Sequence, residues 1–315
     1  MKNLIIDCDP GIDDALAIIL ALKSPSLNLV AVTAVSGNMT SDYTVANALK
    51  VLDLMDAPDI AVAQGPLAPI SRPYPQDPFS HGDDGLANTG LPTSTRPVDP
   101  RSAAQLIVDT VNANPGNISL ACLGPFTNLA LALEIDPDLP AKITEVVAIA
   151  GAFGFTPYAR SQATGDNPTS EWNVYVDPEA ADIVFRAGFN LTAVGLDVTT
   201  HPAINLSPER FDLLATSQRT EALFAADVVR FVRERNYQSY CALIDSLAIG
   251  AILDRSLIQT TEVHCAVETR GTLTLGMTVT DVRNHHRWTD LPLIEAVHDA
   301  DFEAFLDLLV GTLAR

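Results

Sequence analysis

Short apolar runs alternate with helical patterns along the first two thirds of this 315-residue chain. An apolar run of about four to eight residues between turn residues is typical of a strand that is buried on both faces. The helical patterns between the runs provide the crossovers that parallel strands need. The alternation therefore predicts an α/β fold: an open, mainly parallel, Rossmann-like sheet flanked by helices.

The expected boundaries follow from the positions at which the hydrophobic pattern changes. Strands are predicted at residues 3–7, 27–35, 60–63, 118–122, 146–150 and 191–196. Helices are predicted at residues 13–23, 41–55, 102–113, 128–135 and 178–187. After residue 200 the pattern is mostly helical, with helices at 208–217, 220–240 and 301–313 and an added β-hairpin at 263–282. We see no repeat and no linker, so one domain is expected over residues 1–315.

The charge balance narrows the possible partners. The formal net charge is −20 at pH 7, and phosphate groups are bound by basic faces. We therefore expect neither a nucleic-acid partner nor binding to an anionic membrane. No apolar stretch reaches the length of about 18 residues typical of a transmembrane helix, and no signal peptide is indicated. The four cysteines lack metal-ligand spacing, which fits a reducing cytoplasm.

Four aspartates are crowded between the first strand and the first helix. Residues 4–17 read LIIDCDPGIDDALA, and no lysine or arginine occurs between residues 3 and 22. Carboxylates at this density repel one another unless a positive charge lies among them. A turn explains Asp7 and a helix cap explains Asp13, but neither explains all four. A hard divalent cation at the carboxyl end of the strand accounts for the whole cluster.

Six motifs, this cluster included, resemble those of one enzyme family in their order along the chain. They are DCDPGIDDA at 7–15, VSGN at 35–38, HGDDGL at 81–86, LGPFTNLA at 123–130, EWNVYVDPEAA at 171–181 and LIDSLA at 243–248. One such motif alone is moderately specific, whereas six in order are hard to obtain by chance. On these motifs the chain resembles the inosine–uridine-preferring nucleoside hydrolases.

The resemblance implies calcium-dependent hydrolysis of the N-glycosidic bond of ribonucleosides, which yields ribose and a free base. By resemblance, Asp9, Asp14 and Asp245 provide carboxylate oxygens to Ca²⁺. Thr127 would add its backbone carbonyl, a neutral oxygen that calcium accepts. Asp9 would also act as general base toward the metal-bound water, because metal coordination lowers the pKa of water.

Further polar residues match the family's ribose-binding positions. They are Asp13, Asn38, Glu171 and Asn173, and negative charge near the ring favours an oxocarbenium-like transition state. Taken singly, Asn38 would be a turn residue, and Glu171 and Asn173 would be solvated loop residues before a helix. The family's additional sugar-binding asparagine precedes Glu171 by several residues. That stretch is shortened here, and Asn167 is the nearest candidate.

The residue before Asp245 departs from the family pattern. Family members that accept both purines and pyrimidines often have histidine there, whereas this chain has Ile244, which cannot donate a proton. His81, in a glycine-rich loop, is one substitute. Tyr237 and Tyr240, expected on the helical stretch before Asp245, are others, since a phenol donates and an aromatic ring stacks on a base. A solvated histidine and a packed tyrosine are the plainer interpretations.

Two other functions compete with hydrolysis. A phosphatase of the haloacid dehalogenase type also places two alternating aspartates after a strand, but its chemistry needs magnesium, a lysine and a late acidic pair. Only Lys142 is suitably placed for that lysine. A nucleoside or ribose binder without turnover is the second alternative, motivated by Ile244. The family resemblance further implies a role in nucleoside salvage or catabolism and a homodimer or homotetramer.

Overall fold

The computed structural model describes residues 1–76, 80–285 and 287–315. Within them one sheet has the strand order β3-β2-β1-β4-β5-β6-β9-β7-β8. The strands are β1 (Lys2–Cys8), β2 (Leu27–Ala34), β3 (Ala61–Gln64), β4 (Ile118–Cys122), β5 (Glu145–Ile149), β6 (Leu191–Val194), β7 (Ile258–Val267), β8 (Thr278–Asp281) and β9 (Leu293–Ala300). Strands β1 to β6 and β9 pair in parallel, whereas β7 is antiparallel to both β8 and β9. The mainly parallel α/β architecture confirms the prediction.

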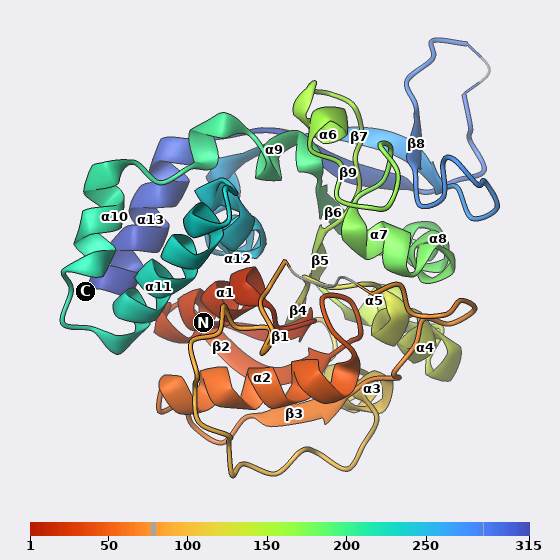
Figure 1. Ribbon diagram of the computed structural model, residues 1–315. Helices are drawn as coiled ribbons and strands as arrows, with labels where there is room; N and C mark the ends of the chain where they lie inside the picture. Colours follow the sequence, from red (N-terminus) through yellow and green to blue (C-terminus); the bar gives the residue numbers. More distant parts are fainter. Residues whose placement is uncertain (77–79, 286) are drawn as a thin grey trace.

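Helices cover both faces of this sheet (Figure 1). Leu4 and Ile6 of β1 belong to one hydrophobic core, whereas Ile5 between them belongs to the other, as expected for a strand buried on both faces. Helices of the first core are α1 (Ile12–Lys23), α2 (Ser41–Leu54), α10 (Pro208–Ala215), α11 (Thr220–Glu234), α12 (Ile244–Leu253) and α13 (Phe302–Ala314). Helices of the second core are α3 (Ala103–Ala113), α4 (Thr127–Ile135), α5 (Leu139–Lys142), α7 (Trp172–Val176) and α8 (Pro178–Arg186).

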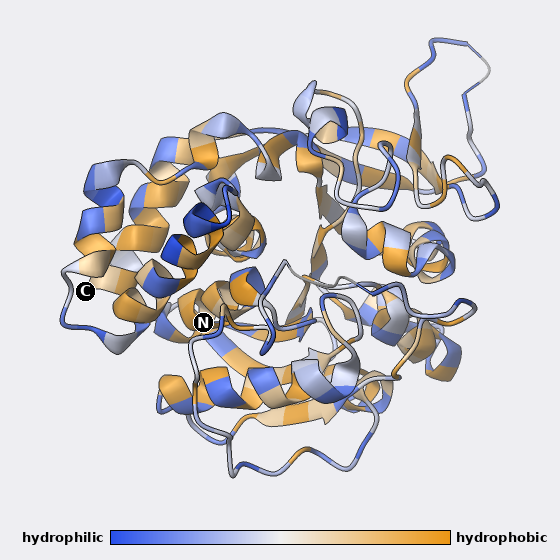
Figure 2. Ribbon diagram, viewed as in Figure 1, coloured by the Kyte–Doolittle hydropathy of each residue, from blue (hydrophilic) through white to orange (hydrophobic). Residues whose placement is uncertain are grey.

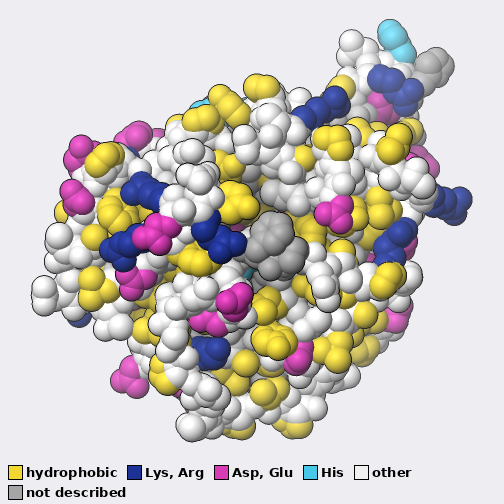
Figure 3. All heavy atoms as spheres, in the orientation of Figure 1, with side chains coloured by type: hydrophobic (Ala, Val, Ile, Leu, Met, Phe, Trp, Pro, Cys, Tyr) yellow, Lys and Arg dark blue, Asp and Glu magenta, His cyan; other side chains and the backbone are white. Residues whose placement is uncertain are grey.

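Short helical turns complete the described chain. They are α6 (Tyr158–Ser161), α9 (Leu196–Thr199), η1 (Pro202–Ile204), η2 (Ser239–Ala242) and η3 (Arg255–Leu257). None of the described helices is both long and apolar enough to cross a lipid bilayer. On the face shown in Figure 3, the Lys and Arg side chains lie in separate groups interspersed with Asp and Glu.

The chain changes direction across the sheet at β1. Strands β2 and β3 follow on one side of β1, whereas β4, β5 and β6 follow on the other side. The connections after β1 and β4 therefore diverge, and a crevice opens outside the carboxyl ends of these two strands. The aspartate-rich segment directly follows β1, so the topology places it at this crevice.

Helix α12 carries Asp245 and is apolar around its whole circumference. Residues 245–252 are all buried, and the helix packs against α1, β5 and α13. Most residues of α12 are hydrophobic, and the visible part of the helix is largely orange in Figure 2. A helix that is buried on every side has no amphipathic period. The sequence of α12 therefore shows no periodic pattern from which the helix could be predicted.

Two other expectations after residue 200 need correction. The helix expected over 220–240 is wrong in its last turn, because α11 ends at Glu234 and Asn236 adopts a left-handed φ of 64°. Tyr237 therefore lies in the loop between α11 and η2, and Tyr240 lies in η2. The predicted hairpin is present as β7 and β8, but β9 was missed because charged residues interrupt its apolar alternation.

Candidate active site

A cavity of about 490 Å³ lies at the crevice. Most of the residues predicted from sequence to bind substrate or activate the base line it: Asp13, Asn38, His81, Glu171, Asn173, Tyr237 and Tyr240. Asp245, predicted as a metal ligand, lines it as well. Asp9 and Asp14 are buried directly beside them, as their interactions with Asp13 and Asp245 indicate. Residues as distant in sequence as Asp13 and Asp245 thus share one site.

Asp9, Asp13, Asp14 and Asp245 form what we call the carboxylate cluster. Asp13, Asp14 and Asp245 each offer an oxygen that lies within 4.8 Å of the other two, and all three residues are buried. Asp13 and Asp14 are in the first turn of α1, and Asp245 is in the first turn of α12. The positive ends of two helix dipoles therefore meet the negative charge and offset part of the repulsion.

Asp9 is held between two glycines. Its Oδ2 accepts a hydrogen bond of 2.6 Å from the backbone N–H of Asn38. A Cβ atom on Gly37 would lie 2.0 Å from Oδ2, and one on Gly124 would lie 2.6 Å from Oδ1. Any side chain at either position would displace the carboxylate. The glycines of two of the sequence motifs thus make room for Asp9.

The carboxylate cluster is electrostatically costly without a cation. Burial raises the pKa of Asp9 well above its usual range, and the charge of Asp14 raises it further. Burial also raises the pKa of Asp245, with added repulsion from Asp13 and Asp14. A cation among these oxygens would favour the ionised forms and reverse both shifts. Because the donors are all oxygen atoms, the cluster fits a hard divalent cation such as Ca²⁺.

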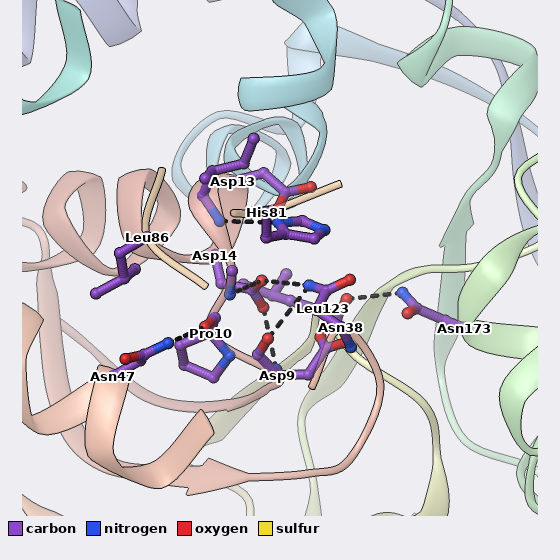
Figure 4. A network of polar contacts seen from close by, with 12 residues as sticks. Asp9, Pro10, Asp13, Asp14, Asn38, Asn47, His81, Leu86, Leu123 and Asn173 are labelled. Carbon is purple, nitrogen blue, oxygen red and sulfur yellow. Dashed lines mark hydrogen bonds and ion pairs between the residues drawn. The ribbon is translucent and has the colours of Figure 1, made fainter. Parts of the chain in front are cut away.

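Asn38 supports the carboxylate cluster with its side chain (Figure 4). Its Nδ2 donates to Asp14 Oδ2 at 3.1 Å and to the Asp9 carbonyl at 3.2 Å. The backbone N–H groups of Asp9 and Gly11 donate to the two carboxylate oxygens of Asp14, at 3.1 and 2.9 Å. In this structure, therefore, the amide of Asn38 positions Asp9 and Asp14.

Glu171 and Asn173 are fixed by a short helix that the sequence pattern did not predict. Glu171 is the N-cap of α7, and its carboxylate accepts from the N–H groups of Asn173, Val174 and Gly151 at 2.8, 3.1 and 3.2 Å. Burial nevertheless raises the pKa of Glu171 to about 7. The Nδ2 of Asn173 donates to the Leu123 carbonyl at 2.7 Å and to the carbonyl at the end of β5 at 3.0 Å.

Thr127 is not brought to the cavity. It is the first residue of α4, its Oγ1 donates to Asp177 Oδ2 at 2.6 Å, and it is absent from the lining. Leu123, four residues earlier, lines the cavity and directs its carbonyl toward Asn173 (Figure 4). A functional backbone carbonyl leaves no side-chain signature in the sequence. Only the position of Leu123 directly after β4 could have indicated a role for its carbonyl.

Asn167 also lies outside the cavity lining. Its Nδ2 donates to the Leu275 carbonyl at 2.9 Å, and its Oδ1 accepts from the backbone N–H and the hydroxyl of Thr169. The side chain therefore stabilises its own loop. Asp166, its neighbour, lines the cavity instead and accepts from the Tyr175 hydroxyl at 3.2 Å. In this shortened loop, therefore, Asp166 rather than Asn167 lies at the cavity.

His81 reaches the cavity in a defined tautomer. The backbone N–H of Ile12 donates to Nδ1 at 3.1 Å, so the neutral ring carries its hydrogen on Nε2. A Cβ on Gly11 would lie 2.3 Å from Nδ1, so only glycine permits this approach. Asp13 Oδ1 lies 3.9 Å from the same nitrogen. The structure thus places His81 next to α1, with Nδ1 directed toward the first turn of that helix.

The two tyrosines differ in their surroundings. The Tyr240 hydroxyl donates to Gln162 Oε1 at 2.8 Å, and burial raises its pKa to about 12. Tyr237 is 42% exposed and lies at the rim. Ile244 lines the cavity beside Asp245, as its sequence position predicted.

The model of the inosine-uridine preferring nucleoside hydrolase family matches residues 4–307. The chain belongs to this family. It is 36% identical to a pyrimidine-specific ribonucleoside hydrolase, RihA, of Salmonella arizonae, with 98% of this chain and 97% of the relative covered. The RihA of a Shewanella species is 37% identical, with 99% and 96% covered. These homologues are ribonucleoside hydrolases, which act on N-glycosyl bonds, so the phosphatase alternative is excluded.

Solved structures of the family have the same fold. A plant nucleoside hydrolase superposes with a TM-score of 0.87 at 33% identity, with 99% of each chain covered. A purine-preferring ribonucleoside hydrolase from Gardnerella vaginalis superposes with a TM-score of 0.85 at 29% identity, with 99% of this chain and 98% of that chain covered. The names of these relatives differ in base preference, so they leave the base to be argued from the cavity itself.

Proposed function

We propose that this protein hydrolyses the N-glycosidic bond of ribonucleosides at the cavity, with Ca²⁺ bound by Asp9, Asp14 and Asp245. The buried carboxylate cluster at the end of β1 carries this proposal, since it needs a cation and lies beside polar residues suited to a sugar. We assign the neutral oxygen ligand to the carbonyl of Leu123, in place of Thr127.

Each residue of the site has a distinct task in this proposal. When bound, calcium would bind water and the ribose hydroxyls and lower the pKa of that water. Asp9, fixed by the Asn38 N–H, accepts the proton of the attacking water. Asp13 and Glu171 hydrogen-bond the ribose, and their negative charge favours the oxocarbenium-like transition state. Asn173 keeps the ends of β4 and β5 together below the sugar.

The departing base would meet hydrogen-bond donors other than the histidine that family members often have at the position of Ile244. His81 lines the cavity, and Tyr237 brings its phenol to the rim. The hydroxyl of Tyr240 is engaged by Gln162, so it contributes its ring face. We therefore assign His81 and Tyr237 to hydrogen bonding of the departing base.

We further propose a homodimer or homotetramer that works in nucleoside salvage or catabolism in the cytoplasm, with residues 1–315 as one domain. All four cysteines are free thiols, and three of them are buried, which suits a reducing compartment. Light scattering during size-exclusion chromatography measures the oligomer: a monomer would contradict this part of the proposal.

The central experiment compares p-nitrophenyl riboside with uridine, cytidine, inosine and adenosine, each with calcium and with chelator. Nitrophenolate leaves without a proton, so this substrate reports on the ribosyl site alone. Calcium-dependent turnover of the nitrophenyl compound supports the hydrolase function. No turnover of any compound, with calcium still bound, would overturn hydrolysis and leave the nucleoside-binding alternative.

A further inference from the structure

The cavity is strongly negative and has no cationic side chain of its own. Asp166 and Glu171 add two carboxyl groups to the cavity, beside the carboxylate cluster. In the described part of the chain, no Lys or Arg is among the residues that line the cavity. One Ca²⁺ would add two positive charges against the four carboxylates of the cluster. The field inside the cavity therefore remains negative even with the cation bound.

Three side chains near the position of the base, those of Ile244, Tyr240 and His81, are poorly suited to protonate it. Ile244 stands where a donor would lie beside Asp245, and the Tyr240 hydroxyl donates to Gln162. A doubly protonated His81 would need a hydrogen on Nδ1, where the N–H of Ile12 already points. The cavity thus favours a base that leaves without a proton.

Aromatic side chains line the same cavity. Trp172, Tyr237 and Tyr240 are all part of its lining, and the faces of such rings attract cations. The described lining combines carboxylates with aromatic rings and contains no Lys or Arg. This combination is complementary to a flat cation rather than to a neutral or anionic ring.

We propose that the preferred substrates are N-ribosides of positively charged aromatic rings, of the pyridinium riboside class, an inference that rests on the proposed hydrolase function. In this reaction the bond from C1′ to the ring nitrogen breaks, and its electron pair neutralises the ring, which leaves without a proton. Water oxygen bonds to C1′, and the water proton passes to Asp9. A neutral nucleoside would instead expel an anionic base.

Binding without turnover tests the charge preference directly. Two C-ribosides serve as probes, 3-(β-D-ribofuranosyl)-1-methylpyridinium and 3-(β-D-ribofuranosyl)toluene, which share a shape, differ in charge and have no N-glycosidic bond to break. Calorimetry on the calcium-loaded protein should show about tenfold tighter binding of the cation. Equal binding, or tighter binding of the toluene compound, would overturn the inference.

A matched pair of variants locates the preference. Asp166→Asn removes one carboxylate from the cavity and should lower the ratio of the two affinities several-fold. Asp138→Asn changes an exposed aspartate that lies outside the cavity lining and should leave the ratio unchanged. An unchanged ratio in Asp166→Asn would contradict the role of this side chain.

Kinetics separate this inference from the proposed function. The kcat/KM should be highest for 1-(β-D-ribofuranosyl)pyridinium, lower for the uncharged p-nitrophenyl riboside and lowest for uridine. Hydrolysis of p-nitrophenyl riboside with slower hydrolysis of the pyridinium compound would overturn the inference and leave the hydrolase function intact. Failure to turn over any of the three would overturn the hydrolase function itself.

Discussion

At the scale of single residues, Asp9 depends on neighbours that have no side chains. Gly37 and Gly124 leave room for its two oxygens, and the N–H of Asn38 fixes one of them. Asp9 would act both as a cation ligand and as the proton acceptor. Its geometry is therefore more constrained than that of an ordinary surface carboxylate.

Asp9→Asn should lower kcat by roughly 10²–10⁴-fold, because an amide cannot accept the proton of water. The variant should also bind calcium more weakly, since one anionic oxygen is lost. Turnover of p-nitrophenyl riboside and calcium titration calorimetry measure the two effects. A variant that retains wild-type kcat would show that another group is the base.

Gly37→Ala should lower kcat/KM by roughly 10²-fold through a shift of the Asp9 carboxylate. The new Cβ would lie 2.0 Å from Asp9 Oδ2, too close for either group to stay in place. Gly311→Ala is the matched control, since the nearest atom to its added Cβ lies 3.8 Å away. Equal activity of both variants with p-nitrophenyl riboside would contradict the proposed constraint.

Residue identity was predictable where side chains carry the chemistry. Asp9, Asp13 and Asp14 of the carboxylate cluster were predicted from the crowding of aspartates after the first strand, and Asp245 was predicted from the family resemblance. The Leu123 carbonyl, which we propose as the neutral oxygen ligand, was not predicted, because a backbone carbonyl has no residue preference. Asn167 was predicted from its residue type, whereas its side chain contacts its own loop and the Leu275 carbonyl, and the sequence pattern does not reveal such contacts.

At the scale of elements, helix N-termini assemble the site. The first turns of α1 and α12 carry three of the four cluster carboxylates, and α7 is capped by Glu171. Helix α1 was predictable from its acidic first turn. Helix α12, which is buried on every side, and helix α7, which is only five residues long, lack the amphipathic period that reveals a helix in sequence.

Ile244→His should raise kcat for uridine by roughly 10²-fold, because a proton donor would then stand on the first turn of α12. Ile244 already lines the cavity, so the imidazole should reach the base without moving the helix. Turnover of p-nitrophenyl riboside, which needs no proton, serves as the internal control and should stay within a few-fold of the wild type. A similar gain on both substrates would refute leaving-group activation as the cause.

At the scale of the whole molecule, the mainly parallel sheet was predictable because alternating strands and helices favour parallel pairing through helical crossovers, whereas the strand order was not predicted. The switch in direction at β1 then fixed the edge at which the site lies. Strand β9 was not predicted, since its place between β6 and β7 depends on pairing with partners far away in sequence.

The same topology concentrates buried acids at one edge of the sheet, which makes stability depend on pH. The pKa of Asp7 and that of Glu171 are each raised to about 7, mainly by burial, and those of Asp9 and Asp245 are also raised. Between the unfolded and folded pKa values, the native state binds more protons than the unfolded chain. The free energy of unfolding of the calcium-free protein should therefore fall as pH rises from about 4 through about 7.

Calcium should reverse the part of this dependence that comes from the carboxylate cluster, because it binds the ionised carboxylates of the cluster. The rise in Tm caused by saturating calcium, relative to chelator, should thus grow between about pH 5 and about pH 8. At the lower pH, protons compete with calcium for Asp9, Asp14 and Asp245, whereas at the higher pH the cation alone neutralises them. Differential scanning calorimetry with calcium and with chelator measures this difference. A calcium-induced shift that is constant, or larger at the lower pH, would mean that calcium does not bind the carboxylate cluster.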